Sequence, residues 1–453
     1  MDRFTRAIAM ASARRPWRTI AAWIAVLAGM FALAGAAGGT FADDFAAPGS
    51  QSARAMDLIG DTFPEAAQGR ALVVLQARDD TTIDQDRADV AQVLADVDGL
   101  DHVATVTDPF RTGTISDDGR IAYAEITLDV PEREMGKPAF TVLSDGVSGM
   151  GTDALRVELG GDAVFLNSED ETSGHVGIGL LVALIVLLIA FGTAVAAVLP
   201  IGLSLVAVGG GIGAITLLAS PMTVSVSAIP VAGLVGLGVG VDYALFVVAR
   251  YRENRESGQD DSTALGGAMS TSGAAVVFAG GTVVVATAAL AITGIGILTS
   301  IGFATALMVA AAVAAAVTLL PALLSLLGDR IDKGRIGRRR SVEVAAPKAE
   351  ETAWWRFAHR VAARPWPYLV GSVVALLAVA APAVAMQTAF PAAGDAPEHT
   401  THRQAYDLLT EGWGEGINAP LTVVIDLGED AAGSADADGV ETVATEIAAV
   451  PGI

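Results

Sequence analysis

Long apolar runs alternate with polar blocks along this chain, and the alternation predicts membrane helices beside an external domain. A helix needs about 20 mainly apolar residues to cross the hydrocarbon core of a bilayer. We expect turns between spans at Pro200 and Pro221, because proline interrupts helices. Seven runs are long enough, at about 17–37, 176–197, 199–219, 223–248, 273–293, 299–327 and 368–385.

The first polar block shows the short periodicities of a small α+β domain. Strands alternate every two residues and are bounded by turn residues such as Asp117–Gly119. The β-α-β-β-α-β order is the ferredoxin-like order, which gives a sheet with helices on one face. The expected elements are strands Leu72–Ala77, His102–Asp108, Ile121–Val130 and Leu155–Leu159, and helices Thr82–Val97 and Pro138–Met150.

These patterns predict an α-helical polytopic membrane protein with an external ferredoxin-like domain. We expect six segments: an N-terminus with the first span (1–37), the external domain (38–173), a five-span bundle (174–328), a basic linker (329–366), a seventh span (367–387) and the start of a second external domain (388–453).

Basic residues predict the orientation in the membrane. Of the 28 lysines and arginines, 18 lie at the start of the first span, between the fourth and fifth spans, or between the sixth and seventh. By the positive-inside rule these segments are cytoplasmic. Residues 38–173, with 27 acidic and nine basic side chains, are then extracytoplasmic, in a multi-pass protein of the plasma membrane.

An internal repeat with an offset of about 350 residues relates the two ends of the chain. It predicts a parallel duplication of one span and the start of one external domain. We therefore expect the first span to be an uncleaved helix and the chain to be part of a longer protein; a natural half-length protein is the alternative. The matching segments are ARRPW (Ala13–Trp17) and ARPW (Ala363–Trp366), APGSQSARAMDLI (Ala47–Ile59) and APEHTTHRQAYDLL (Ala396–Leu409), and ALVVLQARD (Ala71–Asp79) and PLTVVIDLGED (Pro420–Asp430).

The composition of the chain argues against several kinds of site and partner. The absence of cysteine excludes disulfides and thiol catalysis, and the five histidines show no metal-ligand spacing. No Walker A sequence is present, and a net charge of −22 argues against a nucleic-acid partner. We expect no metal and no cofactor.

One carboxylate lies inside the apolar region. Asp242 is the only charged residue from Val176 to Val248. A carboxylate at the centre of a membrane helix costs roughly 2.5–3.5 kcal/mol, so it usually has a function inside a bundle. The alternative is that Asp242 reaches water at the helix end, but it lies about 12 Å deeper than Arg250.

Small residues recur every four positions around this carboxylate, at Ala232, Gly236, Gly240 and Ala244. Such a face lets two helices approach closely. We expect this packing to bury Asp242 and to hold a partner helix against it. The hydroxyl of Tyr243 can donate to a carboxylate. A buried acid that gains and loses a proton can bias a helix between two packings.

The segment GVGVDYALFVVARYRE, the order of spans and domains, and the repeat together resemble the actinobacterial MMPL transporters of the resistance-nodulation-division superfamily. The resemblance implies proton-driven export of lipids, glycolipids or other hydrophobic compounds. It also implies that Asp242 and Tyr243 form one half of a proton relay, with Phe246 as an aromatic neighbour. The second Asp-Tyr pair of such transporters would lie about 350 residues further on, beyond this chain. Thr282 is the only polar side chain near the relay in the fifth expected span.

Two other functions fit part of the pattern. One is a non-transporting receptor or scaffold related to sterol-sensing proteins, and the other is an accessory subunit of protein export. We do not expect an enzyme, because the external domain shows no nucleophile–base motif. We expect membrane lipids and a hydrophobic or lipidic substrate as partners, and the sequence fits either a monomer or a homo-oligomer. Arg111, Arg120 and Arg156 are candidates to meet acidic head groups.

Overall fold

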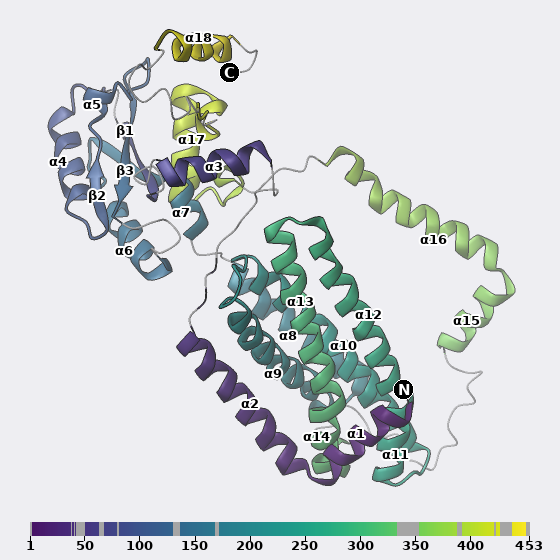
Figure 1. Cartoon of the computed structure of the whole chain (residues 1–453). Coiled ribbons are helices and arrows are strands. Elements are labelled where there is room, and N and C mark those ends of the chain that lie inside the picture. The colour runs from purple at the N-terminus through teal and green to yellow at the C-terminus, as the bar shows by residue number, and fades with distance from the viewer. Residues whose placement is uncertain are drawn as a thin grey trace.

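The computed structural model (Figure 1) describes a domain with a small sheet, called the external domain after its expected location, the apolar helices, and parts of the segment from residue 353 on, called the second copy after the expected repeat. The described residues are 2–37, 39, 41, 50–62, 68–78, 81–129, 136–167, 172–332, 353–386, 392–420, 423–425 and 437–449.

Six helices among the described residues are long and apolar enough to cross a membrane. Two of them join several helical elements: Asp261–Thr293 runs through α11, η2, α12 and η3, and Gly296–Leu327 through α13, η4 and α14. The expectation of a polytopic membrane protein is confirmed. The others are α2 (Pro16–Ala37), α9 (Ala194–Leu218), α10 (Ala228–Glu256), and α16 (Pro365–Ala380) with η7 (Ala381–Ala385).

The break between the second and third expected spans does not occur at Pro200. Helix α8 (Thr172–Phe191) ends before Gly192, which has φ +65°, and α9 begins at Ala194. Glycine adopts this left-handed conformation without steric cost, so it ends the helix. Pro200 lies inside α9, where its missing N–H removes one backbone hydrogen bond without ending the helix, and its carbonyl accepts a hydrogen bond from Ser204 Oγ (2.8 Å). Pro221 does lie in a turn, as expected.

Helix α10 packs against α9 and α13 (Gly296–Ala314). The remaining bundle elements are α11 (Asp261–Ala268), the π-helix η2 (Met269–Gly273), α12 (Ala274–Ala288), η3 (Ala289–Thr293), the π-helix η4 (Ala315–Leu319), α14 (Leu320–Leu327) and η5 (Gly328–Asp332).

An amphipathic helix, α1 (Asp2–Arg14), crosses one end of the bundle (Figure 1). Ala9 is fully buried there, and Thr5 Oγ1 donates to the carbonyl of Met269 (3.3 Å). The chain then turns at Arg15 into α2, because the ring of Pro16 disfavours helical dihedral angles at the residue before it. The second copy has the same break at Arg364, between α15 (Ala353–Ala363) and α16, so the repeat extends to local structure.

The external domain contains a four-stranded antiparallel sheet in the order β2-β3-β1-β4. The β-α-β-β-α-β order read from the sequence is present. Val73 and Leu75 face one side, under α4 and α6, and Val74 faces the other. The elements are β1 (Arg70–Ala77), α4 (Arg87–Asp98), β2 (Val103–Val106), α5 (Pro109–Thr112), β3 (Ile121–Leu128), α6 (Gly136–Ser148), β4 (Leu155–Gly160) and α7 (Asp162–Asn167).

The strand expected over His102–Asp108 is shorter than the sequence suggested. It ends at Val106, because Asp108 caps a short helix, α5, by accepting a hydrogen bond from the Phe110 amide (2.9 Å). The turn at Asp117–Gly119 precedes β3, with Gly119 at φ +70°.

The second face of the sheet is covered by a helix from the second copy. Helix α17 (Thr401–Trp413) places Ala405, Leu408 and Leu409 against Val74 and Ile121. The sequence did not predict this, because the contact joins residues more than 280 positions apart. Other described elements are α3 (Gln51–Thr62), η8 (Ala393–Asp395), η9 (Glu415–Asn418) and α18 (Ala437–Ala448); the repeat segment Pro420–Asp430 lies largely outside the described residues.

Candidate functional site

The intramembrane carboxylate lies on a strip of α10 that no described element covers. Asp242 is exposed, as are Gly238 and Ala249, and Leu234 and Phe246 are 59% and 60% exposed. These positions follow the helical period and so share one face. The expectation that close packing within this chain buries Asp242 is wrong.

The small residues lie on a different face of α10. Ala232, Gly236, Gly240 and Ala244 are all buried between α9 and α13. A Cβ at Gly240 would lie 2.8 Å from Ser204 Oγ, and a Cβ at Gly236 would collide with Met308. Close packing therefore needs these glycines, but it positions α10 without covering the acid.

Tyr243 points into the bundle, away from the exposed strip. It is 8% exposed, and its hydroxyl oxygen lies 3.4 Å from where a Cβ would stand at Gly280 of α12. Consecutive residues of a helix are turned by about 100°, which explains why neighbours in sequence face different surroundings. Within the described chain, no hydrogen bond joins Tyr243 to Asp242.

Thr282 does not complete a site within this chain. It is exposed on α12, and its hydroxyl donates to the carbonyl of Phe278 one turn earlier (2.9 Å). This bond is local to the helix, so it leaves no donor directed at α10.

The polar end of α10 is held by a charged cluster that the sequence analysis did not single out. Arg255 Nε pairs with Asp261 Oδ1 (2.7 Å), and the Tyr251 hydroxyl donates to the same oxygen (3.2 Å). Arg252 donates to the carbonyl of Phe191 at the end of α8 (2.8 Å). These contacts fix α10 against neighbouring helices at about 14–20 Å along the helix from Asp242. The only sequence signal was a run of charges just after a span.

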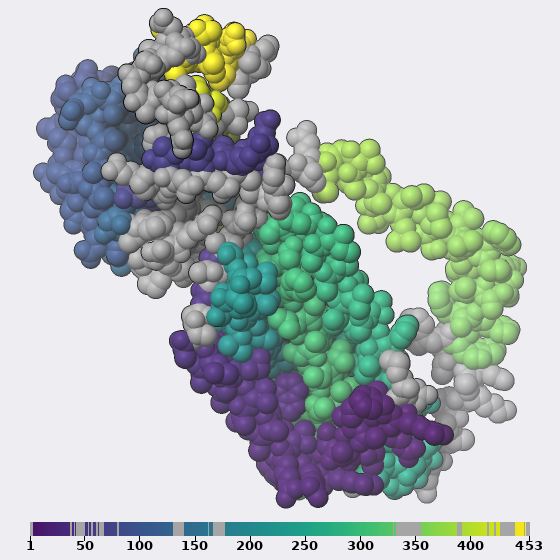
Figure 2. All heavy atoms as spheres, in the orientation of Figure 1, coloured from purple at the N-terminus to yellow at the C-terminus, as the bar shows by residue number. Residues whose placement is uncertain are grey.

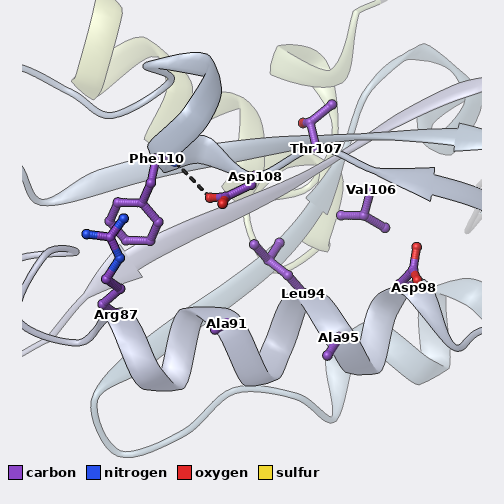
Figure 3. Close-up of a pocket in the computed structure, with 9 residues that line it drawn as sticks. All are labelled: Arg87, Ala91, Leu94, Ala95, Asp98, Val106, Thr107, Asp108 and Phe110. Carbon is purple, nitrogen blue, oxygen red and sulfur yellow. Dashed lines mark hydrogen bonds between the residues drawn. The ribbon is translucent and has the colours of Figure 1, made fainter.

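A second candidate is a groove on the external domain, between α4 and the β2–α5 segment (Figure 3). It encloses about 350 Å³. The Arg87 guanidinium lies over the Phe110 ring, 4.0 Å from its centroid, beside the apolar Leu94. The lining also includes the carboxylates of Asp98 and Asp108, so the groove presents charges of both signs around an apolar floor. The sequence could not show the groove, since it forms only when α4 packs beside β2.

The three arginines named from the sequence do not converge. Arg156 pairs with Glu158 (3.0 Å) and donates to Gln404 of α17 (2.7 Å), so it joins two parts of the external domain. Arg111 and Arg120 are exposed. Among the described residues, no group of three or more histidine, aspartate or glutamate side chains could hold a metal ion.

Comparison with known proteins decides the family. The profile of the MMPL family matches residues 44–368, more than two thirds of the chain. The chain belongs to the MMPL family. Members of this family are transporters rather than enzymes.

Several relatives are similar over much of the chain. Membrane protein YdfJ of Bacillus subtilis is 32% identical over 91% of this chain and 56% of its own length. Putative membrane protein SCO6666 of Streptomyces coelicolor is 31% identical over 98% of this chain and 63% of its own length. Trehalose monomycolate exporter MmpL3 of Mycolicibacterium smegmatis is 30% identical over 63% of this chain and 30% of its own. This MMPL chain thus spans about 60% of the length of the first two.

Proposed function

We propose that this chain forms one half of a proton-driven exporter of lipids or other hydrophobic small molecules. Asp242 takes up and releases the proton, and Tyr243 and Phe246 belong to the same relay. The family supports transport, and the MmpL3 relative is named as an exporter of a lipid.

The observation that carries the proposal is the exposed carboxylate on α10. An acidic side chain facing lipid costs roughly 2.5–3.5 kcal/mol or more. A second helix bundle covering the strip of Leu234, Gly238, Asp242 and Phe246 would remove that cost. It would also place the acid at the centre of two bundles, where protonation can alter how they pack.

A second half of the protein is the proposed occupant of the strip. The repeat at an offset of about 350 residues supports it, and so does the greater length of the relatives. The second half would bring a second Asp-Tyr pair against Asp242, with Tyr243 on the inner side of α10.

The external domain is proposed to be a ferredoxin-like porter domain that passes the cargo. The strand order β2-β3-β1-β4 and the two helices on one face support this assignment. The basic residues at the α1 end support a cytoplasmic N-terminus and an extracytoplasmic domain in the plasma membrane.

The test is export by the full-length protein carrying Asp242→Asn. The amide preserves shape but cannot exchange a proton, so export of a labelled lipid from proteoliposomes with an imposed proton gradient should fall to the level of empty vesicles. Asp260→Asn, in the exposed loop after α10, is the matched control and should export normally. Undiminished export by Asp242→Asn would refute the relay and favour a receptor or scaffold.

A further inference from the structure

A cluster of arginines surrounds the junction of α1 and α2 at one end of the bundle. All five are exposed: Arg3, Arg6, Arg14, Arg15 and Arg18. In the part of the chain that the structure describes, none of them pairs with a carboxylate. Figure 2 shows this junction in purple as open surface at the lower end of the bundle.

The arginines of α10 at the same end are already engaged. Arg250 pairs with Glu253 (2.7 Å), Arg252 binds a backbone carbonyl, and Arg255 pairs with Asp261. The positive charge at the α1–α2 junction is a local feature, because the chain as a whole is strongly acidic. An unneutralised patch on an acidic protein indicates an anionic partner for that patch.

Two aromatic side chains indicate where this patch lies relative to the bilayer. Trp17 is 72% exposed and Phe4 is 67% exposed. Tryptophan concentrates at the level of the lipid head groups, where its ring meets apolar chains and its N–H meets polar groups. Arginine and tryptophan in the first turn of a membrane helix therefore lie at head-group depth.

The patch is held rigidly against the bundle. Thr5 is bonded to Met269, Ala9 is fully buried, and Trp23 Nε1 donates to Thr318 Oγ1 (3.0 Å). The guanidinium groups are thus presented by a fixed helix, which lowers the entropic cost of binding. Planar guanidinium groups bind phosphate oxygens in pairs of parallel hydrogen bonds.

The second copy repeats this composition. Arg356, Arg360 and Arg364 are exposed on α15 and at its end, and Trp366 is 73% exposed at the start of α16. Exposed arginines and an exposed tryptophan therefore occur at both the α1–α2 and the α15–α16 junctions, so this composition belongs to the repeat unit.

We propose that the α1–α2 junction is a binding surface for anionic phospholipid, with Arg14, Arg15 and Arg18 contacting head-group phosphates and Trp17 anchoring at the same depth. The surface selects phosphate-bearing anionic lipid from the leaflet on the N-terminal side of the bundle. It does not depend on proton-coupled transport.

The test measures how strongly each of two brominated lipids quenches a fluorophore attached at this surface. Because the chain contains no cysteine, Ala11→Cys on the exposed side of α1 gives one fluorophore site. The labelled chain is reconstituted in phosphatidylcholine vesicles in which a fixed fraction of lipid is brominated phosphatidylglycerol or brominated phosphatidylcholine. Quenching should favour phosphatidylglycerol by roughly fivefold or more, and the preference should shrink in high salt.

Three triple variants distinguish binding by these arginines from a general effect of positive charge. Arg14→Gln, Arg15→Gln and Arg18→Gln together should abolish the preference, while the lysine replacements at the same positions should retain part of it. Arg78→Gln, Arg111→Gln and Arg120→Gln on the external domain remove the same charge and should leave it intact.

Equal quenching by the two lipids in the unaltered chain would overturn the proposal. So would a preference that survives the first triple variant. A second label at Ser220, in the loop after α9, should show no preference for phosphatidylglycerol, and an equal preference there would also contradict a local surface.

Discussion

At the scale of single residues, the surroundings of Asp242, Tyr243 and Gly240 differ although they lie within four positions of one another. The acid is exposed, the phenol is buried against α12 and α13, and the glycine touches α9. The unusual residue, Asp242, could be found from sequence because it is the only charged residue from Val176 to Val248. Its orientation could not, because nearly every face of these glycine-rich helices is apolar and small.

Two glycines of α10 provide a matched stability test. Gly240→Val should lower the free energy of unfolding by about 1–3 kcal/mol, because the new side chain meets Ser204. Gly238→Val, with nothing within 4 Å of its Cβ position, makes the same chemical change in the same helix. Thermal unfolding of the two variants in detergent compares them. Equal melting temperatures would show that the close approach of α9 and α10 does not need Gly240.

At the scale of elements, the strands and the helices α4 and α6 followed the sequence pattern closely. Their apolar residues recur at the period of a strand or a helix over a few positions, so the pattern can be read from short stretches of sequence. The predicted ends of two elements were wrong, because local backbone conformation determines where an element ends. Gly192 rather than Pro200 ends a helix, and Asp108 ends a strand by capping α5. The docking of α17 on the sheet could not be predicted, because both partners also look like ordinary amphipathic elements.

The docking of α17 should weaken in acid. Burial lowers the pKa of His402, which lies in α17 beside the Phe165 ring. The undocked helix then binds more protons, so docking is strongest above about pH 6.5 and is lost as the pH falls through the lowered pKa. Hydrogen exchange of α17, corrected for the intrinsic rate, should increase between about pH 7.5 and about pH 5.5.

Replacement variants identify the group responsible. His402→Leu should remove most of this pH dependence, and His399→Leu, at an exposed position, should retain it. Glu398 and Asp407 also border this region. An unchanged pH dependence in His402→Leu would assign the effect to another group.

At the scale of the whole molecule, two uncovered surfaces are related to the repeat. One is the α10 strip, and the other is α16 with η7, none of whose apolar window is buried. Figure 1 shows α15 and α16 standing apart from the bundle. A second bundle can cover both, which unites the repeat, the family and the exposed acid in one arrangement.

Accessibility of the strip tests this arrangement. Phe246→Cys should react with a membrane-permeant maleimide in the 453-residue chain, where Phe246 is 60% exposed. In the full-length protein the same cysteine should be at least about tenfold less reactive, because close-packed interfaces exclude the reagent. Ile189→Cys on α8, 80% exposed, is the control and should react in both. Equal reactivity of the Phe246 cysteine in the two proteins would mean that the strip faces lipid.

The most direct measurement of the central claim is proton movement through Asp242. Full-length protein in liposomes containing a pH-sensitive dye would be given an outward gradient of a lipid cargo. The account predicts proton flux that depends on cargo and disappears in Asp242→Asn, with the Asp260→Asn control unchanged. Cargo-dependent proton flux that persists in Asp242→Asn would contradict the role of this carboxylate in the relay.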